Sequence, residues 1–163
     1  MQDSGEKSEP GARRRAEEAG RAERRAAGRI LGLDVGLRRI GVAISDEMGW
    51  TAQGLETLER ANPRVDAAKL AELIRERGVT RVVVGLPLHM DGRESRQGAI
   101  VRQFAEKLRE RSGAAVELWD ERLSTVEAGR VLRASGVGIE KRAKAVDRLS
   151  AVLILQSYLD ARS

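Results

Sequence analysis

Residues 82–86 read Val-Val-Val-Gly-Leu, a short continuous apolar run rich in β-branched side chains. Such a run is typical of a strand that is covered on both faces, as the strands of parallel sheets are. The segments after it alternate in pattern: a helix is predicted over 95–111, a strand over 115–119 and a last helix over 145–161. A sheet with helices on both of its faces is therefore expected.

The chain before this run predicts three strands in antiparallel order. Residues 30–35 and 40–44 read as strands joined by a tight turn, and a third strand is expected over 53–58. Asn62 followed by Pro63 then predicts the start of a helix. The whole order indicates an α/β domain with a mixed five-stranded sheet and helices on both faces, which is the arrangement of ribonuclease H-like domains.

Residues 1–28 differ from the rest of the chain in composition. They include no Val, Ile, Leu or Phe, and they mix seven basic with six acidic residues. A segment without apolar side chains to bury is expected to be a disordered extension or a frayed helix. Residues 29–163 are then expected to form one ribonuclease H-like domain.

Composition excludes several classes of site. The chain has no Cys, which excludes disulfides, thiolate metal sites and Cys nucleophiles. No apolar run approaches the roughly 18 residues that span a bilayer, and the first residues lack the apolar segment of a secretory signal, so a cytoplasmic protein without a membrane partner is expected. The net charge of +5 fits a nucleic-acid partner and equally a solvated surface.

Four carboxylates stand apart from the acids on Lys- and Arg-rich helix faces. Asp34 lies within the first predicted strand, Asp120 and Glu121 lie where the strand over 115–119 ends, and Asp147 lies in the first turn of the last helix. Because side chains alternate along a strand, only one of Asp120 and Glu121 is expected to point into a shared site.

Three carboxylates at one end of a sheet repel one another unless a cation neutralises them. Mg²⁺ or Mn²⁺ accepts such oxygen ligands, and two such ions about 4 Å apart activate water and stabilise the leaving oxygen in phosphodiester cleavage. A divalent-metal site at Asp34, Asp147 and one of Asp120 or Glu121 is therefore predicted. The structural alternatives are that Asp34 bonds to the turn that follows it and that Asp147 favours its helix N-terminus.

Basic residues flank these acids, as phosphate contacts or as a solvated rim. They are Arg38, Arg39, Arg122, Lys141, Arg142 and Lys144. The single histidine, His89, lies in a polar loop, where an exposed or structural role is more typical than a catalytic one. Glu127 is assigned to a capping box with Ser124. This capping box predicts a helix that begins at Ser124 and runs to Ala134.

Four ordered blocks of the chain resemble the YqgF family, whose members are described as Holliday junction resolvases and as nucleases that mature the precursor of small-subunit ribosomal RNA. The blocks are LDVGLRRIGVAIS, VVVGLPLHMDG, WDERLSTVEA and KRAKAVDRLSAVLILQSYLD. The resemblance extends over about Ile30 to Asp160 and implies a ribonuclease H-like fold with a divalent-metal nuclease site. It implies catalytic roles for Asp34, Glu121 or its neighbour Asp120, and Asp147. His89 stands where the family pattern has asparagine.

The leading hypothesis is a metal-dependent endonuclease that acts on structured nucleic acid and processes the 5′ end of pre-16S rRNA in ribosome biogenesis. Its closest rival is a Holliday junction resolvase that cuts four-way DNA junctions in recombination and repair. A resolvase needs a two-fold dimer and an RNA nuclease does not, so a monomer or a homodimer is expected.

Two other classes of function are weaker. An ATP-binding fold related to actin and sugar kinases shares the D-x-G turn after the first strand, but those proteins close two such domains over the nucleotide. A non-catalytic ribosome assembly factor would bind through its basic surface and would not need the three acids.

Overall fold

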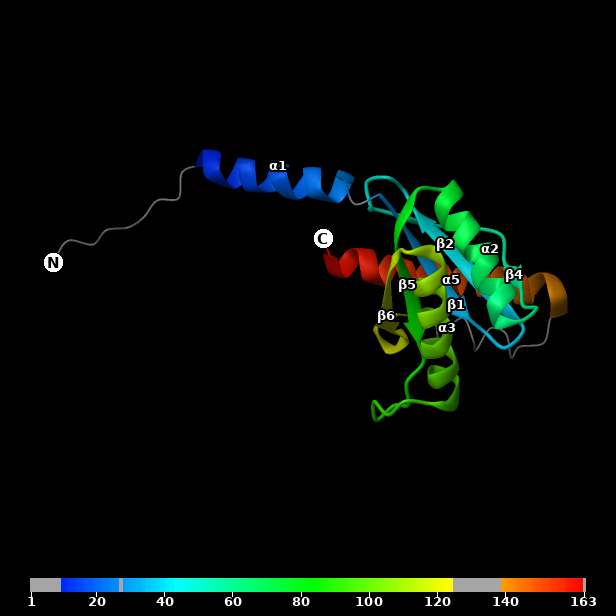
Figure 1. Ribbon diagram of the computed structural model, residues 1–163. Coiled ribbons are helices and arrows are strands. Elements are labelled where there is room, and N and C mark those ends of the chain that lie inside the picture. The colour runs from blue at the N-terminus through cyan, green and yellow to red at the C-terminus, as the bar shows by residue number, and fades with distance from the viewer. Residues whose placement is uncertain (1–9, 27, 125–138, 163) are drawn as a thin grey trace.

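The computed structural model describes residues 10–26, 28–124 and 139–162. Its elements follow one another in the order α1 (Pro10–Ala26), β1 (Arg29–Val35), β2 (Arg39–Ser45), β3 (Ala52–Gly54), β4 (Leu58–Glu59), α2 (Pro63–Glu76), β5 (Val79–Leu86), α3 (Arg96–Ser112), β6 (Ala115–Asp120), the 3-10 turn η1 (Glu121–Leu123) and α5 (Ile139–Arg162). Figure 1 shows α1 extending away from the sheet, whereas the other helices pack against it. The helix predicted from Ser124 to Ala134, with Glu127, lies outside the described residues after Ser124.

The strands form one mixed sheet in the order β3-β2-β1-β5-β6, with β4 also paired to β2. β1 pairs antiparallel with β2 and parallel with β5, and β5 pairs parallel with β6. The mixed sheet is confirmed, but it has six strands where five were predicted. The third strand expected over 53–58 is divided into β3, which pairs with residues 43–45 of β2, and β4, which pairs with residues 39–40.

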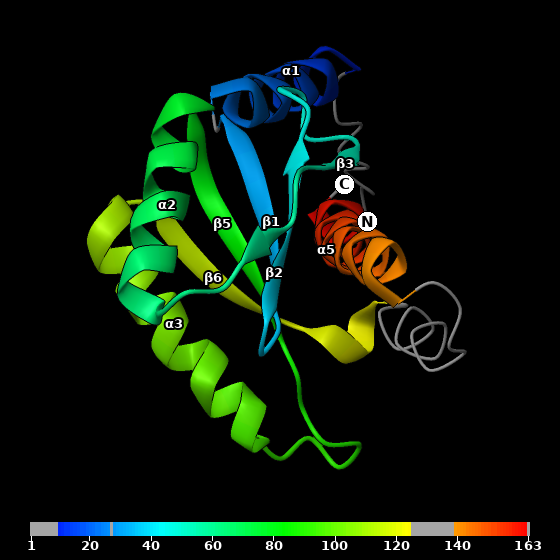
Figure 2. The same ribbon diagram turned by 90° about the vertical axis from the view of Figure 1, so that its right-hand side faces the viewer.

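Helices cover both faces of this sheet, as predicted. Figure 2 shows α2 and α3 on one face and α5 on the other. The core on the first face includes Leu31, Val84 and Phe104, all of them at most 2% exposed. The core on the second face includes Val83 and Leu155, both fully buried. The sheet therefore lies between two apolar layers.

Helix α5 packs unusually close to the sheet because glycines face it from four strands. A Cβ atom built at Gly32, Gly54 or Gly85 would lie 2.3–2.6 Å from a side-chain atom of α5, and one built at Gly41 would lie 2.0 Å from the backbone oxygen of Asp147. Real Cβ atoms do not make such contacts. At Gly32 and Gly41 the obstacle is a Cβ atom or backbone, which cannot rotate away, so a side chain there would push the helix outward. The glycines set the distance at which α5 carries Asp147 over the sheet.

Of the two alternatives for residues 1–28, a disordered extension or a frayed helix, the described part of the segment is helical. Residues 10–26 are helical, and the described side chains of residues 11–19 are exposed. Alanine, arginine and glutamate are strong helix formers, so the segment has a helical preference without any core to pack against. Among the helices of the described residues, none is both long and apolar enough to cross a bilayer.

Candidate active site

Asp34 lies near the end of β1 with its side chain on the α5 face of the sheet. Ile30 belongs to the α5-side core and Gly32 contacts α5, so strand alternation places Asp34 on the same face. The residue is 6% exposed, and it pairs in register with Gly41 of β2. A carboxylate is therefore buried near the end of β1, the strand in which the sequence placed it.

Glu121 brings a second buried carboxylate next to Asp34. It is the first residue of η1, directly after β6, and it is 7% exposed. Its Cγ and Oε1 atoms lie 3.1 Å from the position that a Cβ atom of Gly85 would occupy. Leu33 pairs with Val84, so Gly85 is the neighbour of Asp34 on the adjacent strand. The Glu121 carboxylate thus lies over β5, one strand away from Asp34.

Asp147 comes to the same end of the sheet from α5. It is 7% exposed, and its backbone oxygen lies over Gly41, the register partner of Asp34. Its Oδ2 atom accepts a hydrogen bond of 2.8 Å from Nε of Arg39. Three buried acids from distant segments therefore lie over the neighbouring strands β2, β1 and β5.

Asp120, the alternative to Glu121, binds Arg122. Its Oδ1 accepts from the backbone N–H of Arg122 at 2.9 Å, and its Oδ2 accepts from Nη2 of Arg122 at 2.7 Å. The guanidinium of Arg122 holds the pKa of Asp120 below its ordinary value. Asp120 is therefore a half-buried ion-pair partner of Arg122, and Glu121 is the buried acid at this position.

The three buried acids form a possible donor set for a divalent cation. Within residues 10–26, 28–124 and 139–162, no group of three Asp, Glu or His side chains is arranged as a ready metal site. The chemistry of the donors nevertheless fits, because three buried carboxylates supply the hard oxygen ligands that Mg²⁺ and Mn²⁺ take, and buried like charges favour a bound cation. These residues are suited to hold such an ion.

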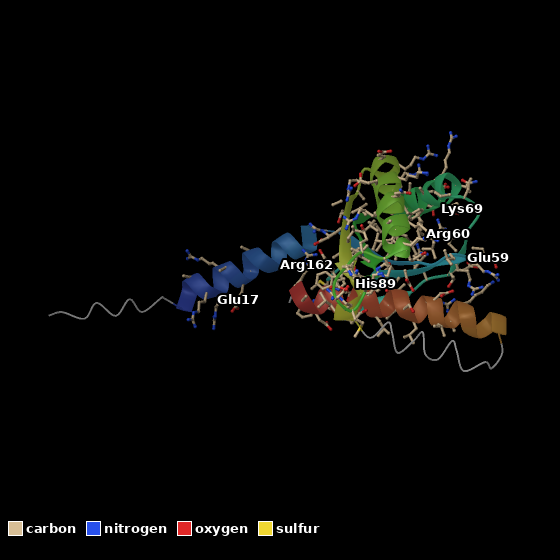
Figure 3. The ribbon with its side chains drawn as sticks, turned by 90° about the horizontal axis from the view of Figure 1, so that it is seen from below. Glu17, Glu59, Arg60, Lys69, His89 and Arg162 are labelled. Atoms are coloured by element: carbon tan, nitrogen blue, oxygen red, sulfur yellow. The ribbon has the colours of Figure 1, made fainter. Side chains whose placement is uncertain are left out.

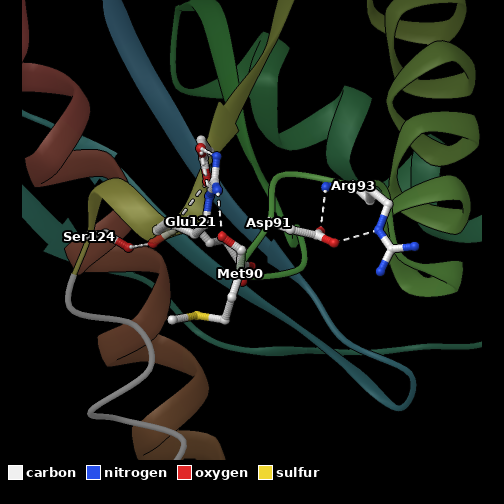
Figure 4. Close-up of polar contacts among 7 residues, drawn as sticks. Met90, Asp91, Arg93, Glu121 and Ser124 are labelled. Carbon is white, nitrogen blue, oxygen red and sulfur yellow. Dashed lines mark hydrogen bonds and ion pairs between the residues drawn. The ribbon is translucent and has the colours of Figure 1, made fainter.

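The loop between β5 and α3 borders Glu121. Figure 4 shows Met90 and Asp91 of this loop beside Glu121, whose backbone oxygen accepts a bond of 2.8 Å from the Ser124 hydroxyl. Nη1 of Arg122 donates to the backbone oxygen of Met90 at 3.4 Å and links the loop to η1. His89, labelled in Figure 3, is exposed on this loop, and its backbone N–H donates to the oxygen of Arg93.

The predicted basic residues fall into different settings. Arg39 is paired with Asp147 and Arg122 with Asp120, while Lys144 lies 3.6 Å from Glu59, which is labelled in Figure 3. Arg38 is exposed. The side chains of two further candidates lie outside the described residues, namely Lys141 and Arg142.

The sequence interpretation missed the part that glycine plays in this site. Gly41 and Gly85 provide the space over which Asp147 and Glu121 lie. The signal was present: each is a glycine inside an otherwise apolar, β-branched strand, where glycine often marks a close approach of another segment.

Comparisons with known proteins place this fold and site in context. The family model described as "RuvX: Holliday junction resolvase" matches residues 28–161. A "Putative pre-16S rRNA nuclease" of Koribacter versatilis is 53% identical over 135 residues, which cover 83% of this chain and 88% of that protein. A protein of the same name from Bacillus thuringiensis (strain Al Hakam) is 48% identical over 136 residues, covering 82% of this chain and 99% of that protein.

Solved structures with the same architecture include RuvC of T. thermophilus in complex with a Holliday junction substrate. Its TM-score is 0.53 at 15% identity, covering 82% of this chain and 95% of that chain. The Holliday junction resolvase of Fowlpox virus has a TM-score of 0.50 at 14% identity, covering 82% and 98%. At these identities the similarity concerns the fold, and it confirms the ribonuclease H-like prediction.

Proposed function

Because this chain belongs to the RuvX family of Holliday junction resolvases, also called YqgF, we propose that it is a nuclease that hydrolyses phosphodiester bonds in structured nucleic acid. The observation that carries the proposal is the burial of Asp34, Glu121 and Asp147 at one end of the sheet. Burying a carboxylate is costly, and buried acids from three distant segments at one end of a sheet are typical of a functional site.

Asp34, Glu121 and Asp147 are the residues that would hold a divalent cation, Mg²⁺ or Mn²⁺. When bound, such an ion supplies an activated water and stabilises the leaving oxygen of the cleaved phosphodiester. The protein's own part is to hold three buried carboxylates at one end of the sheet, beside the α5-side core. Asp120 is left out of this set because Arg122 holds its carboxylate.

The proposed substrate is the 5′ end of pre-16S rRNA, processed in the cytoplasm during ribosome biogenesis. Support comes from two relatives that are about half identical over most of their length and carry the pre-16S rRNA nuclease name. The second candidate is the four-way DNA junction, which the family description favours. That substrate requires two sites related by a two-fold axis, and therefore a homodimer.

One experiment tests the activity and chooses between the substrates. The purified protein is incubated with a precursor rRNA fragment and with a synthetic four-way DNA junction, each with Mg²⁺, with Mn²⁺ and with EDTA. Metal-dependent cleavage of the RNA alone supports rRNA processing, and symmetric cleavage of the junction alone supports the resolvase.

Asp34→Asn is the matched variant for this experiment, because it keeps the size of the side chain and removes its charge. We expect it to abolish cleavage and to leave nucleic-acid binding and the fold intact. Equal cleavage by Asp34→Asn and wild type would refute the nuclease site. Binding without cleavage of either substrate by wild type would favour the non-catalytic assembly factor.

A further inference from the structure

Arg39 is a cation in direct contact with one of the three buried acids. It is the first residue of β2, and it lies two residues before Gly41, so its side chain is on the α5 face. Its Nε donates to Oδ2 of Asp147 at 2.8 Å. The Arg39 side chain is 27% exposed and the Asp147 side chain 9%, so the guanidinium lies between the buried carboxylate and solvent.

Only one edge of the Arg39 guanidinium is used by this contact. Within the part of the chain that the structure describes, Nε bonds to Asp147 and neither Nη1 nor Nη2 has a partner. A guanidinium presents five N–H donors in a planar fork, and its Nη edge matches two oxygens of a phosphate. Asp147 thus holds one edge of the Arg39 guanidinium, and the Nη edge is left for another acceptor.

We propose that Arg39 binds a backbone phosphate of the nucleic acid through its Nη groups while Asp147 holds its Nε, an inference that rests on the proposed function. Asp147 then serves the site in two ways, as a buried acid and as the group that orients Arg39. The guanidinium is held in place before the strand arrives, so less side-chain entropy is lost on binding.

The neighbouring cations do not offer the same arrangement. Arg122 is occupied by Asp120 through Nε and Nη2, on the η1 side of the site. Lys144 is an exposed point charge 3.6 Å from Glu59. Among the described basic residues, Arg39 therefore combines a fixed orientation, contact with a site acid and an open donor edge.

The test measures binding in EDTA, where no cleavage takes place. Fluorescence anisotropy with a labelled four-way DNA junction and a labelled RNA hairpin gives the Kd and its salt dependence. We expect Arg39→Ala to weaken binding about tenfold, the loss of a charged hydrogen-bonded contact, and to reduce the slope of log K against log salt by about 1. Arg39→Lys should keep the slope, because it keeps the charge, and bind with an affinity between those of Arg39→Ala and wild type.

Arg81→Ala is the matched control. Arg81 also faces α5 and pairs with a carboxylate, Glu117, at 3.0 Å, but it lies at the other end of the sheet, in register with Ile30. We expect its Kd and salt slope to equal those of wild type. Equal losses in Arg39→Ala and Arg81→Ala would refute a specific phosphate contact.

A second comparison separates binding from folding. Arg39→Ala leaves the buried Asp147 carboxylate without its cation, so the same change is also made in an Asp147→Asn background. The double variant should still bind about tenfold more weakly than Asp147→Asn alone. Equal affinities would mean that Arg39 only neutralises Asp147, and the inference would be wrong.

The two proposals fail in distinguishable ways. If wild type cleaves in Mg²⁺ and Arg39→Ala binds as wild type does, the nuclease proposal stands and the Arg39 inference is refuted. If wild type never cleaves but Arg39→Ala loses affinity and salt slope, the phosphate contact stands and the nuclease proposal is refuted.

Discussion

The backbone oxygen of Asp147 lies directly over Gly41, and a Cβ atom built on that glycine would come within 2.0 Å of it. Gly41 is also the register partner of Asp34. Gly41 is therefore a neighbour both of Asp34 on β1 and of Asp147 on α5. The close packing of α5 is a property of the fold, and the convergence of the two acids depends on it.

Gly41→Ala is expected to damage stability and cleavage together. The new methyl group would meet backbone, which cannot rotate away, so α5 must move outward and carry Asp147 with it. We expect a loss of at least about 1–3 kcal/mol in the free energy of unfolding, measured by urea denaturation, and loss of cleavage. Gly11→Ala is the control, because no atom lies within 4 Å of a Cβ built there. Wild-type stability of Gly41→Ala would contradict the packing shown here.

Glu121→Gln and Asp120→Asn are expected to separate two adjacent acids. Glu121 lies buried over β5 near Asp34, so its neutral amide should remove cleavage. Asp120 bonds to Arg122 outside the site, so its amide should retain most of the cleavage rate. Single-turnover cleavage rates of the two variants give the answer. Loss of cleavage in Asp120→Asn with retention in Glu121→Gln would reverse the assignment.

The sequence predicted the central strands well because β1, β2 and β5 are mostly buried apolar runs. β1, β2 and β6 lie within one residue of their predicted bounds, and β5 extends back to Val79. The last helix begins at Ile139, although it was predicted to begin at Ala145. The prediction missed its first turns because they are charged and carry no apolar periodicity.

The choice between Asp120 and Glu121 could not be made from the sequence. Alternation along a strand shows only that two successive residues point to opposite sides. The strand ends at Asp120 and a 3-10 turn begins at Glu121, and this change of backbone directs Glu121 into the site. The Arg39 contact with Asp147 joins residues 108 positions apart, which no local pattern indicates.

Helix α2 shows the same limit in the core. Its start at Asn62 and Pro63 was predicted, and Oδ1 of Asn62 accepts from the backbone N–H of Val65 at 2.9 Å. Two adjacent residues of this helix reverse the usual preference for burial: the apolar Val65 is 38% exposed, and the acidic Asp66 is fully buried. A buried acid is recognised only when its partners are known.

Asp66→Ala is expected to destabilise the fold strongly, by about 3–5 kcal/mol, because it leaves a cation without its partner. Asp66 Oδ1 accepts from the backbone N–H of Ala61 at 3.0 Å, and its Oδ2 accepts from Nε of Arg60 at 3.4 Å. Arg60 in turn donates to the oxygen of Gly36 at 2.9 Å and lies over the ring of Phe104. Urea denaturation measures the loss.

Arg60→Met combined with Asp66→Leu is the control for this pair. It replaces both charges with apolar side chains and should recover much of the stability lost in Asp66→Ala. A double variant no more stable than Asp66→Ala would mean that the burial of volume, and not the unpaired charge, determines the loss.

Asp120→Asn is also expected to change the pH dependence of stability. Arg122 lowers the pKa of Asp120 in the folded protein, so the folded state binds fewer protons there than the unfolded state. The pair therefore stabilises the fold above the unfolded pKa of about 4, and this contribution is lost as pH falls through the lower folded value. Asparagine keeps an oxygen that can accept from the backbone N–H of Arg122, so the variant removes the charge and keeps the cap.

Urea denaturation at pH 7 and at steps from pH 4 to 2 measures this contribution. The difference in unfolding free energy between wild type and Asp120→Asn should be largest at pH 7 and shrink towards zero at the acid end. Glu76→Gln, a change at an exposed acid at the end of α2, serves as the reference for a general charge effect. If the Asp120→Asn difference stayed constant from pH 7 to 2, the ion pair with Arg122 would not be what stabilises η1.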